Sequence, residues 1–352
     1  MTATQRGRDH IRWGMIGCGA VTEVKSGPAL QQAAGSSVVA VMRRNGALAA
    51  DYAKRHGVER WYDDVDALIA DPEVDAVYVA TPPGVHECHA LRVAAAGKPA
   101  YVEKPMARTG SECDRMIAAF AGAGLPLYVA YYRRCLPRFL KVEALIREGA
   151  LGVITGISYR MAAPKHEGAG SWRNEPAHSG GGLFLDVGSH MLDILDYLFG
   201  PLHTVAGVAA NRSATFPTED SVAVSFLAGA AVPGVASFNF ASKIRDETLR
   251  ISGTLGELTL SVFGDEPLCL STASGSRRFH LPNPPHIQQP LIQSIVDELR
   301  GKGTCPSTGD SARRTSRVMD EILDAYYGGR SDEFWTRPAT WPGLIRAKNI
   351  DA

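Results

Sequence analysis

The sequence predicts an α/β protein: an N-terminal, doubly wound parallel sheet, then a C-terminal α+β domain with a large, mostly antiparallel open sheet. Two observations carry this prediction. Over the first 130 residues, short apolar runs alternate with helical patterns, as in a parallel sheet covered by helices on both faces. Further along, most apolar residues alternate with polar ones, as in antiparallel strands. We therefore expect one domain over 1–130, a second over 131–330 and a tail over 331–352.

The strand-like runs of the first domain are short, β-branched or aromatic, and lack strict alternation, as expected for strands buried on both sides. They lie at 12–18, 38–42, 76–81, 100–104 and 126–131. The helical patterns between them lie at about 22–34, 47–56, 85–96 and 110–122.

In the second domain, the expected helices lie at 137–148, 183–199, 290–300 and 310–327. The expected strands lie at 152–163, 204–211, 221–229, 232–240, 248–254 and 256–262. The two-residue period of the five strands after 183–199 predicts hairpin-like, antiparallel pairs.

The composition excludes several classes of protein. Of 352 residues, 45% are hydrophobic and 21% charged, which is ordinary for a globular protein. The formal net charge is zero, and no basic stripe indicates a nucleic acid or membrane-surface partner. The opening "MTATQRGRDH" lacks the apolar core of a secretory signal, and no apolar run approaches a membrane span. Six scattered cysteines without a CxxC pair favour reduced thiols, so we expect a cytoplasmic protein.

"LFLDVGSHMLD", at 183–193, predicts an amphipathic helix that Gly200 and Pro201 end. At about 100° per residue, one face is polar and carries Asp186, His190, Asp193 and Tyr197, with Ser189 and Asp196 beside them. The pattern alone leaves three interpretations: a solvated face, a metal site or a proton-handling site. The interpretation as a metal site is disfavoured, because no third ligand follows at a convincing spacing.

"GCGAVT", at 17–22, follows the first strand and opens the first helix. Gly17 allows a tight turn, Gly19 lets the backbone approach a pyrophosphate, and Ala20 and Val21 offer amides at the helix start. Thr22 replaces the third glycine of the fingerprint, so a chance turn is the alternative. The position between strand and helix favours a dinucleotide site.

The second strand ends in "VMRRN", where NAD-specific sites usually carry a carboxylate for the ribose 2′-hydroxyl. Arg43 and Arg44 instead suit a 2′-phosphate, because guanidinium presents paired donors to phosphate oxygens. We expect NADP(H) to be preferred, with NAD(H) as the second choice. Solvated loop arginines are the alternative.

Two further strand ends contribute to the same crevice. In "ATPPGVHECHA", at 80–90, Thr81, Pro82 and His86 are expected to line the cofactor cleft, and too few ligands are present for zinc. In "YVEKPM", at 101–106, Glu103 is expected to bind the nicotinamide ribose, and Lys104 to contact the cofactor and the reacting oxygen. An exposed salt pair at the strand end is the alternative.

"GCGAVT", "EKP" at 103–105, "AYYRRCLPRF" at 130–139 and "GGGLFLDVGSHMLD" at 180–193 follow one another in the order and spacing of a known family. Nearly the whole chain, to about residue 328, resembles the Gfo/Idh/MocA oxidoreductases, named after glucose–fructose oxidoreductase and inositol dehydrogenase. In lacking a carboxylate after the second strand, the chain resembles the NADP-preferring members of this family.

The resemblance implies reversible hydride transfer between a nicotinamide and a secondary alcohol or ketone of a sugar, polyol or cyclic diol, without a metal. It gives Lys104 a catalytic role and places Asp186 and His190 in the substrate pocket, with either Lys104 or His190 as the proton acceptor. The glycines at 180–182 would let the backbone run close to the ligand, while Asp193 and Asp196 are solvated or structural.

Trp172 and Arg173 are expected to close over the substrate, with a surface loop as the alternative. Tyr132, where the family often has Asn, and Arg134 are further candidates for substrate contact. The resemblance also implies a homodimer or homotetramer formed through the second-domain sheet. Two rival functions remain: a ligand-sensing protein without turnover, and an enzyme that retains its nicotinamide to cleave or epimerise a sugar by transient oxidation.

Overall fold

The computed structural model describes residues 9–164, 171–213, 215–331 and 333–344. The chain divides into two compact units. The first comprises the residues up to 107, 111–135 and 284–313, and the second comprises 108–110, 136–283 and the residues from 314 onward.

This division differs from the predicted boundary near residue 130, because a late segment, 284–313, returns to the first unit. Within that segment, the Ser307 hydroxyl donates to the Val129 carbonyl (2.7 Å), and the Val129 amide donates to the Ser307 carbonyl (3.2 Å). Helix α10 (Gln289–Leu299) of the same segment packs against α2 (Ser26–Gln32).

The first unit is a six-stranded parallel sheet in the order β3-β2-β1-β4-β5-β6. Its strands are β1 (Ile11–Ile16), β2 (Ser36–Met42), β3 (Arg60–Tyr62), β4 (Ala76–Val79), β5 (Ala100–Val102) and β6 (Leu127–Val129). Its other helices are α1 (Ala20–Val24), α3 (Gly46–His56), α4 (Val65–Ala70), η1 (Pro83–Val85), α5 (His86–Ala95), α6 (Gly110–Gly122) and η2 (Tyr132–Cys135). Strand order reverses between β1 and β4, and the crevice at such a point is where open α/β sheets bind ligands.

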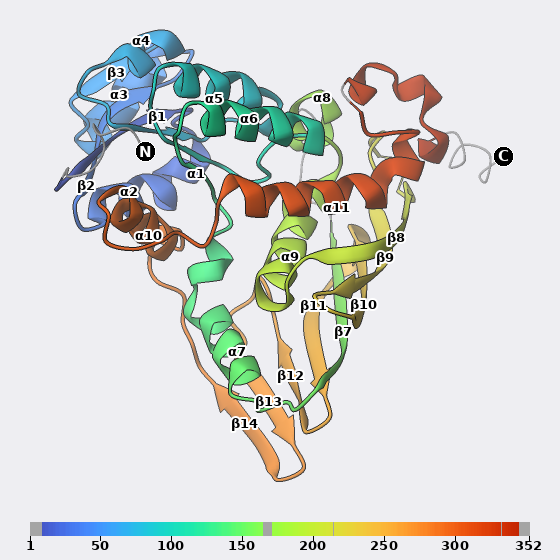
Figure 1. Ribbon diagram of the computed structural model, residues 1–352. Helices are drawn as coiled ribbons and strands as arrows, with labels where there is room; N and C mark the ends of the chain where they lie inside the picture. The colour runs from blue at the N-terminus through green and yellow to red at the C-terminus, as the bar shows by residue number, and fades with distance from the viewer. Residues whose placement is uncertain (1–8, 165–170, 214, 332, 345–352) are drawn as a thin grey trace. The chain divides into compact units, whose positions relative to one another are not determined.

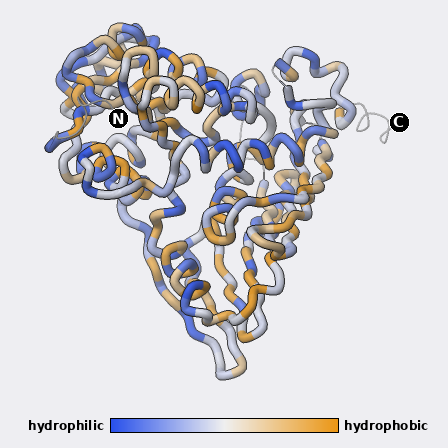
Figure 2. The backbone as a smooth tube through the Cα atoms, viewed as in Figure 1, coloured by the Kyte–Doolittle hydropathy of each residue, from blue (hydrophilic) through white to orange (hydrophobic). Residues whose placement is uncertain are grey.

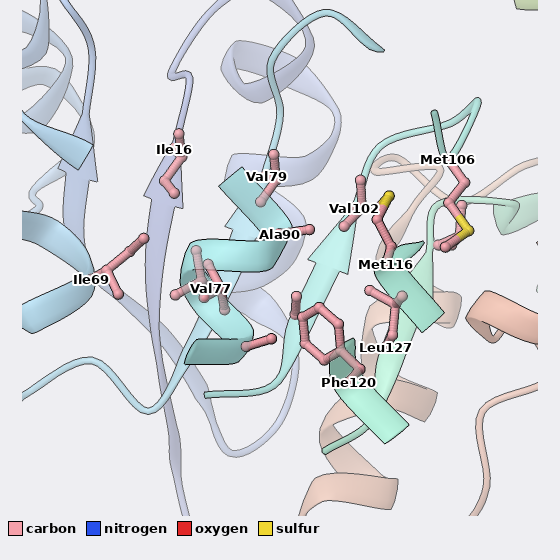
Figure 3. Packing of buried hydrophobic residues seen from close by; sticks show 14 of the residues in the cluster. Ile16, Ile69, Val77, Val79, Ala90, Val102, Met106, Met116, Phe120 and Leu127 are labelled. Atoms are coloured by element: carbon pink, nitrogen blue, oxygen red, sulfur yellow. The ribbon is translucent and has the colours of Figure 1, made fainter. Parts of the chain in front are cut away.

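Helices cover both faces of this sheet, with α4, α5 and α6 on one side and α2 and α10 on the other (Figure 1). Figure 3 shows the packing on the first of these sides, where Val77, Val79 and Val102 meet Ala90 of α5 and Phe120 of α6. All five side chains are at most 1% exposed. The near-continuous apolar strands therefore reflect burial on both faces.

The second unit contains an eight-stranded sheet in the order β14-β13-β12-β11-β7-β10-β9-β8. Its pairs are antiparallel except for β10 with β7. The strands are β7 (Ile154–Pro164), β8 (Leu202–Ala210), β9 (Ser221–Ala228), β10 (Val232–Asn239), β11 (Ala241–Gly253), β12 (Gly256–Leu260), β13 (Leu268–Thr272) and β14 (Gly275–Phe279). The predicted fold class is confirmed in both units.

The remaining helices are α7 (Pro137–Arg147), η3 (Trp172–Asn174), α8 (Pro176–Ser179), α9 (Leu183–Phe199), α11 (Gly309–Tyr327), η4 (Phe334–Thr336) and η5 (Pro338–Thr340). Helix α9 packs on the inner face of the sheet, where Phe184 meets Phe238 edge-on at 5.0 Å between ring centroids. Helix α11 is largely hydrophilic along its length (Figure 2), yet it buries Met319, Ile322 and Leu323 on one side.

Several short elements differ from the prediction. Strand β3, helix α4 and the hairpin β13–β14 were not expected, and the predicted helix 22–34 is two helices, α1 and α2. The expected tail over 331–352 is also not separate where it is described: Trp341 is buried and its ring lies edge-on to that of Tyr327 in α11, 4.7 Å between centroids.

Candidate active site

The glycine turn after β1 leaves open space for a ligand. Gly17 has φ of +91°, and a Cβ there would lie 2.9 Å from Thr81 Cγ2. At Gly19, the nearest atom to an added Cβ is the Gly17 carbonyl oxygen, at 3.9 Å. Gly19 precedes α1 without a side-chain cap, and Ala20 and Val21 form the first turn. The turn is thus tight at Gly17 and accessible at Gly19, as a pyrophosphate requires.

The adjacent strand end supplies a polar atom. Thr81 follows β4, and its Oγ1 is buried with no hydrogen-bond partner among the residues that the structure describes. Pro82, next to it, is half-buried and precedes η1. Buried hydroxyls are rarely left without a hydrogen-bond partner, so a bound ligand is the expected partner of the Thr81 hydroxyl. The open turn and this hydroxyl fit a dinucleotide.

Arg43 and Arg44 are exposed directly after β2. Arg43 Nη1 lies 3.5 Å from the carbonyl oxygen of Cys18, so the first arginine borders the glycine turn. Asn45 follows them and caps α3 by accepting from the Leu48 amide (3.2 Å). Two exposed guanidiniums at this strand end, of which that of Arg43 borders the turn, can bind a phosphate.

His86 has a different place from the predicted one in the cleft. Its side chain is fully buried, with Nε2 2.6 Å from the Thr81 carbonyl oxygen and Nδ1 3.2 Å from those of Pro105 and Met106. Burial lowers the pKa of His86. The imidazole therefore links the loops that follow β4 and β5.

Glu103 lies in a buried hydrogen-bond network. It is 7% exposed, and its Oε1 accepts from the Tyr78 hydroxyl (2.6 Å) and from Gln288 Nε2 (2.7 Å). The Tyr101 hydroxyl donates to Gln288 Oε1 (2.8 Å). Burial and the nearby Glu103 charge raise the pKa of Tyr78 well above its ordinary value. Lys104 is half-buried beside this network, and its amide donates to Glu103 Oε2 (3.2 Å).

Tyr132 and Arg134 lie in η2, and both are buried. Arg134 Nη1 donates to the Pro306 carbonyl (2.9 Å), so its guanidinium joins two segments of the first unit. Their contact with substrate stays a prediction.

In the second unit, three of the predicted residues form one cluster. Asp186 lies in the first turn of α9, and its Oδ2 is 3.0 Å from Arg173 Nε. The Arg173 guanidinium lies over the Trp172 ring, 4.4 Å from its centroid. An aromatic face beside an ion pair offers both an apolar surface and hydroxyl-binding groups.

His190 lies one turn further along α9 and is 4% exposed, with its ring edge-on to Phe263 at 5.9 Å between centroids. Asp193 and Asp196 are also buried, and Arg314 binds both carboxylate oxygens of Asp196 (2.6 and 2.8 Å). The interpretation of this face as solvated is therefore wrong. Asp196 has a structural role.

The glycine run at 180–182 packs against protein, which corrects the prediction that it makes room for a ligand. A Cβ at Gly180, where φ is +82°, would lie 2.8 Å from Arg108 Cα. A Cβ at Gly182 would lie 2.3 Å from the Glu219 carbonyl oxygen. The glycines thus let the start of α9 approach the neighbouring backbone.

Sequence reasoning missed the partners of these residues. Tyr78 and Gln288 are 25 and 185 residues away from Glu103, and no local pattern marks such distant pairs. Within the described ranges, no group of three or more His, Cys, Asp or Glu side chains is arranged to hold a metal, and no helix is long and apolar enough to cross a membrane.

Comparisons with known proteins agree with this geometry. Residues 11–131 match the model of the oxidoreductase family with the NAD-binding Rossmann fold, and residues 139–259 match that of the GFO/IDH/MocA C-terminal domain. Oxidoreductase P35 of Formosa agariphila is 34% identical over 316 residues, which cover 88% of this chain and 98% of the relative. The 1,5-anhydro-D-fructose reductase of Ensifer adhaerens is 28% identical over 337 residues, covering 92% and 99%.

A solved levoglucosan dehydrogenase, in complex with NADH and levoglucosan, shares the fold with a TM-score of 0.81 at 23% identity, over 90% of this chain and 96% of that one. The chain therefore belongs to the Gfo/Idh/MocA family and is an NAD(P)-dependent dehydrogenase or reductase that acts on CH–OH groups.

Proposed function

We propose that the protein is an NADP(H)-dependent oxidoreductase that interconverts a secondary alcohol and a ketone on a sugar, a polyol or a cyclic diol. The observation that carries the cofactor preference is the exposed pair Arg43 and Arg44 directly after β2, where NAD-specific sites carry a carboxylate. Arg43 borders the glycine turn, which favours a phosphate on the adjacent ribose. NAD(H) is the alternative cofactor, because the solved levoglucosan dehydrogenase is a complex with NADH.

Fluorescence titration with NADPH and NADH tests this preference. The variants are Arg43→Gln/Arg44→Gln and, as a control, Arg277→Gln, an exposed arginine of β14. We expect NADPH to bind the wild type at least about tenfold more tightly than NADH. We expect the double variant to lose at least about a hundredfold of its NADPH affinity, since each of the two lost bonds to a charged group costs about 1.5–3 kcal/mol. NADH affinity should change little. Equal affinities for both cofactors in the wild type would overturn the preference.

The substrate class rests on the second unit and on the relatives. Trp172 supplies an apolar face, and the paired Arg173 and Asp186 supply hydroxyl-binding groups, a combination suited to a carbohydrate ring. The name of the Ensifer relative, 1,5-anhydro-D-fructose reductase, supports a sugar ketone.

The chemistry divides between a few side chains. A bound nicotinamide supplies the hydride donor or acceptor at C4. The Lys104 ammonium donates a hydrogen bond to the reacting oxygen and stabilises charge that develops there. His190 takes the proton of the alcohol in oxidation and returns it in reduction, with Lys104 as the alternative base. Asp186 holds Arg173 and binds a neighbouring hydroxyl.

A screen of sugar ketones, polyols and dihydrodiols with NADP(H) and NAD(H) tests the reaction. Turnover of a member of these classes, with release of the cofactor, supports the proposal. Cofactor that survives gel filtration indicates an enzyme with retained nicotinamide, and binding without any turnover indicates a ligand-sensing protein.

We further propose that the outer face of the second-unit sheet pairs with a second copy of the chain in a homodimer or homotetramer. Val208 and Val235 lie on this face, 71% and 55% exposed, and align with Ala223 and Ser225 of the strand between them. Light scattering should give a multiple of 37.7 kDa for the wild type, and a monomer for Val208→Lys/Val235→Lys. A monomeric wild type would refute the pairing.

A further inference from the structure

A buried arginine joins two segments of backbone next to the proposed catalytic residues. Arg330 is 5% exposed, and its Nη1 donates to the Gly180 carbonyl (2.7 Å) while its Nη2 donates to the Arg108 carbonyl (2.7 Å). Its Nε donates to Asp320 Oδ1 (2.8 Å). The planar guanidinium thus uses three donors in fixed directions.

The other residues around Arg330 hold the same two segments. Asp320 Oδ2 accepts from the Gly110 amide (2.7 Å), so Asp320 and Arg330 together bind the backbone of residues 108–110. Arg330 also lies over the rings of Tyr327 and Phe334, at 5.3 and 4.6 Å. These rings restrict where the guanidinium can move.

Glu219 holds the glycine run from its other end. It is 1% exposed, and its Oε1 accepts from the Gly182 amide (2.9 Å) while its Oε2 accepts from the Tyr327 hydroxyl. Burial raises the pKa of Glu219, and the Tyr327 hydroxyl and the Arg330 charge oppose that rise. Gly180 and Gly182 are therefore both bound by buried side chains, immediately before α9.

The segments bound in this way adjoin the proposed catalytic residues along the chain. Gly182 is the N-cap of α9, whose first turn carries Asp186 and whose second carries His190. Arg108 follows Lys104 by four residues. The Gly180 and Arg108 carbonyls and the Gly110 and Gly182 amides each form a hydrogen bond with one of these buried side chains. Because hydrogen bonds are directional, the network fixes where each segment lies.

We propose that Arg330, with Glu219, is a positioning residue for catalysis: by binding the Gly180 and Arg108 carbonyls at once, it fixes the segment before α9 and so sets where α9 presents Asp186 and His190 to the substrate. This inference rests on the proposed function. It assigns a role in the reaction to residues that contact neither the dinucleotide turn nor, in the proposal, the substrate.

The test compares Arg330→Lys with Arg314→Lys. Both variants keep a positive charge and lose a planar guanidinium. Arg330 binds the Gly180 carbonyl, just before α9, whereas Arg314 binds Asp196 within α9, ten residues beyond Asp186. We expect Arg330→Lys to lower kcat about ten- to a hundredfold, because displacements near 1 Å have effects of that size, with the NADPH dissociation constant within about threefold of wild type. Arg314→Lys should keep kcat within about threefold.

Hydrogen exchange separates positioning from general destabilisation. Arg330→Lys should expose the amides of residues 180–190 to faster exchange, and Arg314→Lys should not. If Arg330→Lys does not fold, Tyr327→Phe replaces it as the test variant, because it removes only one donor to Glu219. It should also lower kcat.

The outcomes distinguish the two levels of the proposal. If the wild type binds NADPH but turns over none of the screened substrates, the proposed function fails. If the wild type turns over and Arg330→Lys and Tyr327→Phe keep wild-type kcat, or if Arg314→Lys lowers kcat as much as Arg330→Lys, the positioning role is refuted.

Discussion

The Tyr78 and Tyr101 hydroxyls offer a matched pair of deletions within the first unit. Both rings are buried and stack with their centroids 4.8 Å apart, but Tyr78 donates to the Glu103 carboxylate (2.6 Å) and Tyr101 to the neutral Gln288 amide oxygen (2.8 Å). A bond to a charged group contributes about 1.5–3 kcal/mol and a neutral one about 0.5–1.5 kcal/mol. We therefore expect Tyr78→Phe to lower the free energy of unfolding by about 2 kcal/mol and Tyr101→Phe by about 1 kcal/mol.

Urea unfolding followed by circular dichroism measures both values. The m-value should stay constant, so that a lower midpoint reports stability and not a change in the exposed surface. Phenylalanine keeps the stacked ring, so the difference isolates the hydroxyl. The reasoning would be refuted if Tyr101→Phe cost as much as Tyr78→Phe, or if neither changed the midpoint, because Glu103 would then not depend on its hydrogen-bond donors.

Two further predictions concern other parts of the chain. The bond from Arg55 lowers the pKa of Glu23 from 4.5 to about 2, so this carboxyl stabilises the fold above pH 4.5 and loses its effect as the pH falls toward 2. Glu23→Gln should cost about 0.5 kcal/mol at pH 7, and the difference from wild type should shrink in acid; a difference that grows there would contradict this. Gly182→Ala should cost about 1–3 kcal/mol because its Cβ meets the Glu219 carbonyl oxygen. Gly122→Ala, with open space around its Cβ at the end of α6, should stabilise by up to about 1 kcal/mol in thermal unfolding, and equal effects at the two glycines would be inconsistent with the packing.

Periodicity predicted the long elements well and the short ones poorly. Helix α9 has its predicted bounds, because seventeen residues give the apolar period room to repeat. Strand β3 has only three residues, too few for a pattern, and it forms because β2 beside it offers an open edge. The return of α10 to the first unit could not be inferred, because a helical period does not say which surface its apolar side covers.

The site was predictable where strand ends determine it. Gly17, Thr81 and Lys104 follow neighbouring parallel strands, so their convergence at one edge of the sheet follows from topology. His86 shows the limit: its position on a helix after such a strand indicated the cleft, but its ring nitrogens lie within 3.2 Å of three backbone carbonyl oxygens and the ring is enclosed. Arg330 could not be found, because two of its three acceptors are backbone oxygens, which leave no mark on the sequence.

The most direct test of the proposed mechanism is the kcat/KM of Lys104→Met on a substrate found in the screen, measured beside its NADPH affinity. We expect kcat/KM to fall about 10²–10⁴-fold, the contribution of a positioned acid or base, and the NADPH affinity to fall much less, because Lys104 is only one of the groups expected to contact the cofactor. If kcat/KM stays within a few-fold of wild type, Lys104 does not act on the reacting oxygen and the proposed mechanism is wrong.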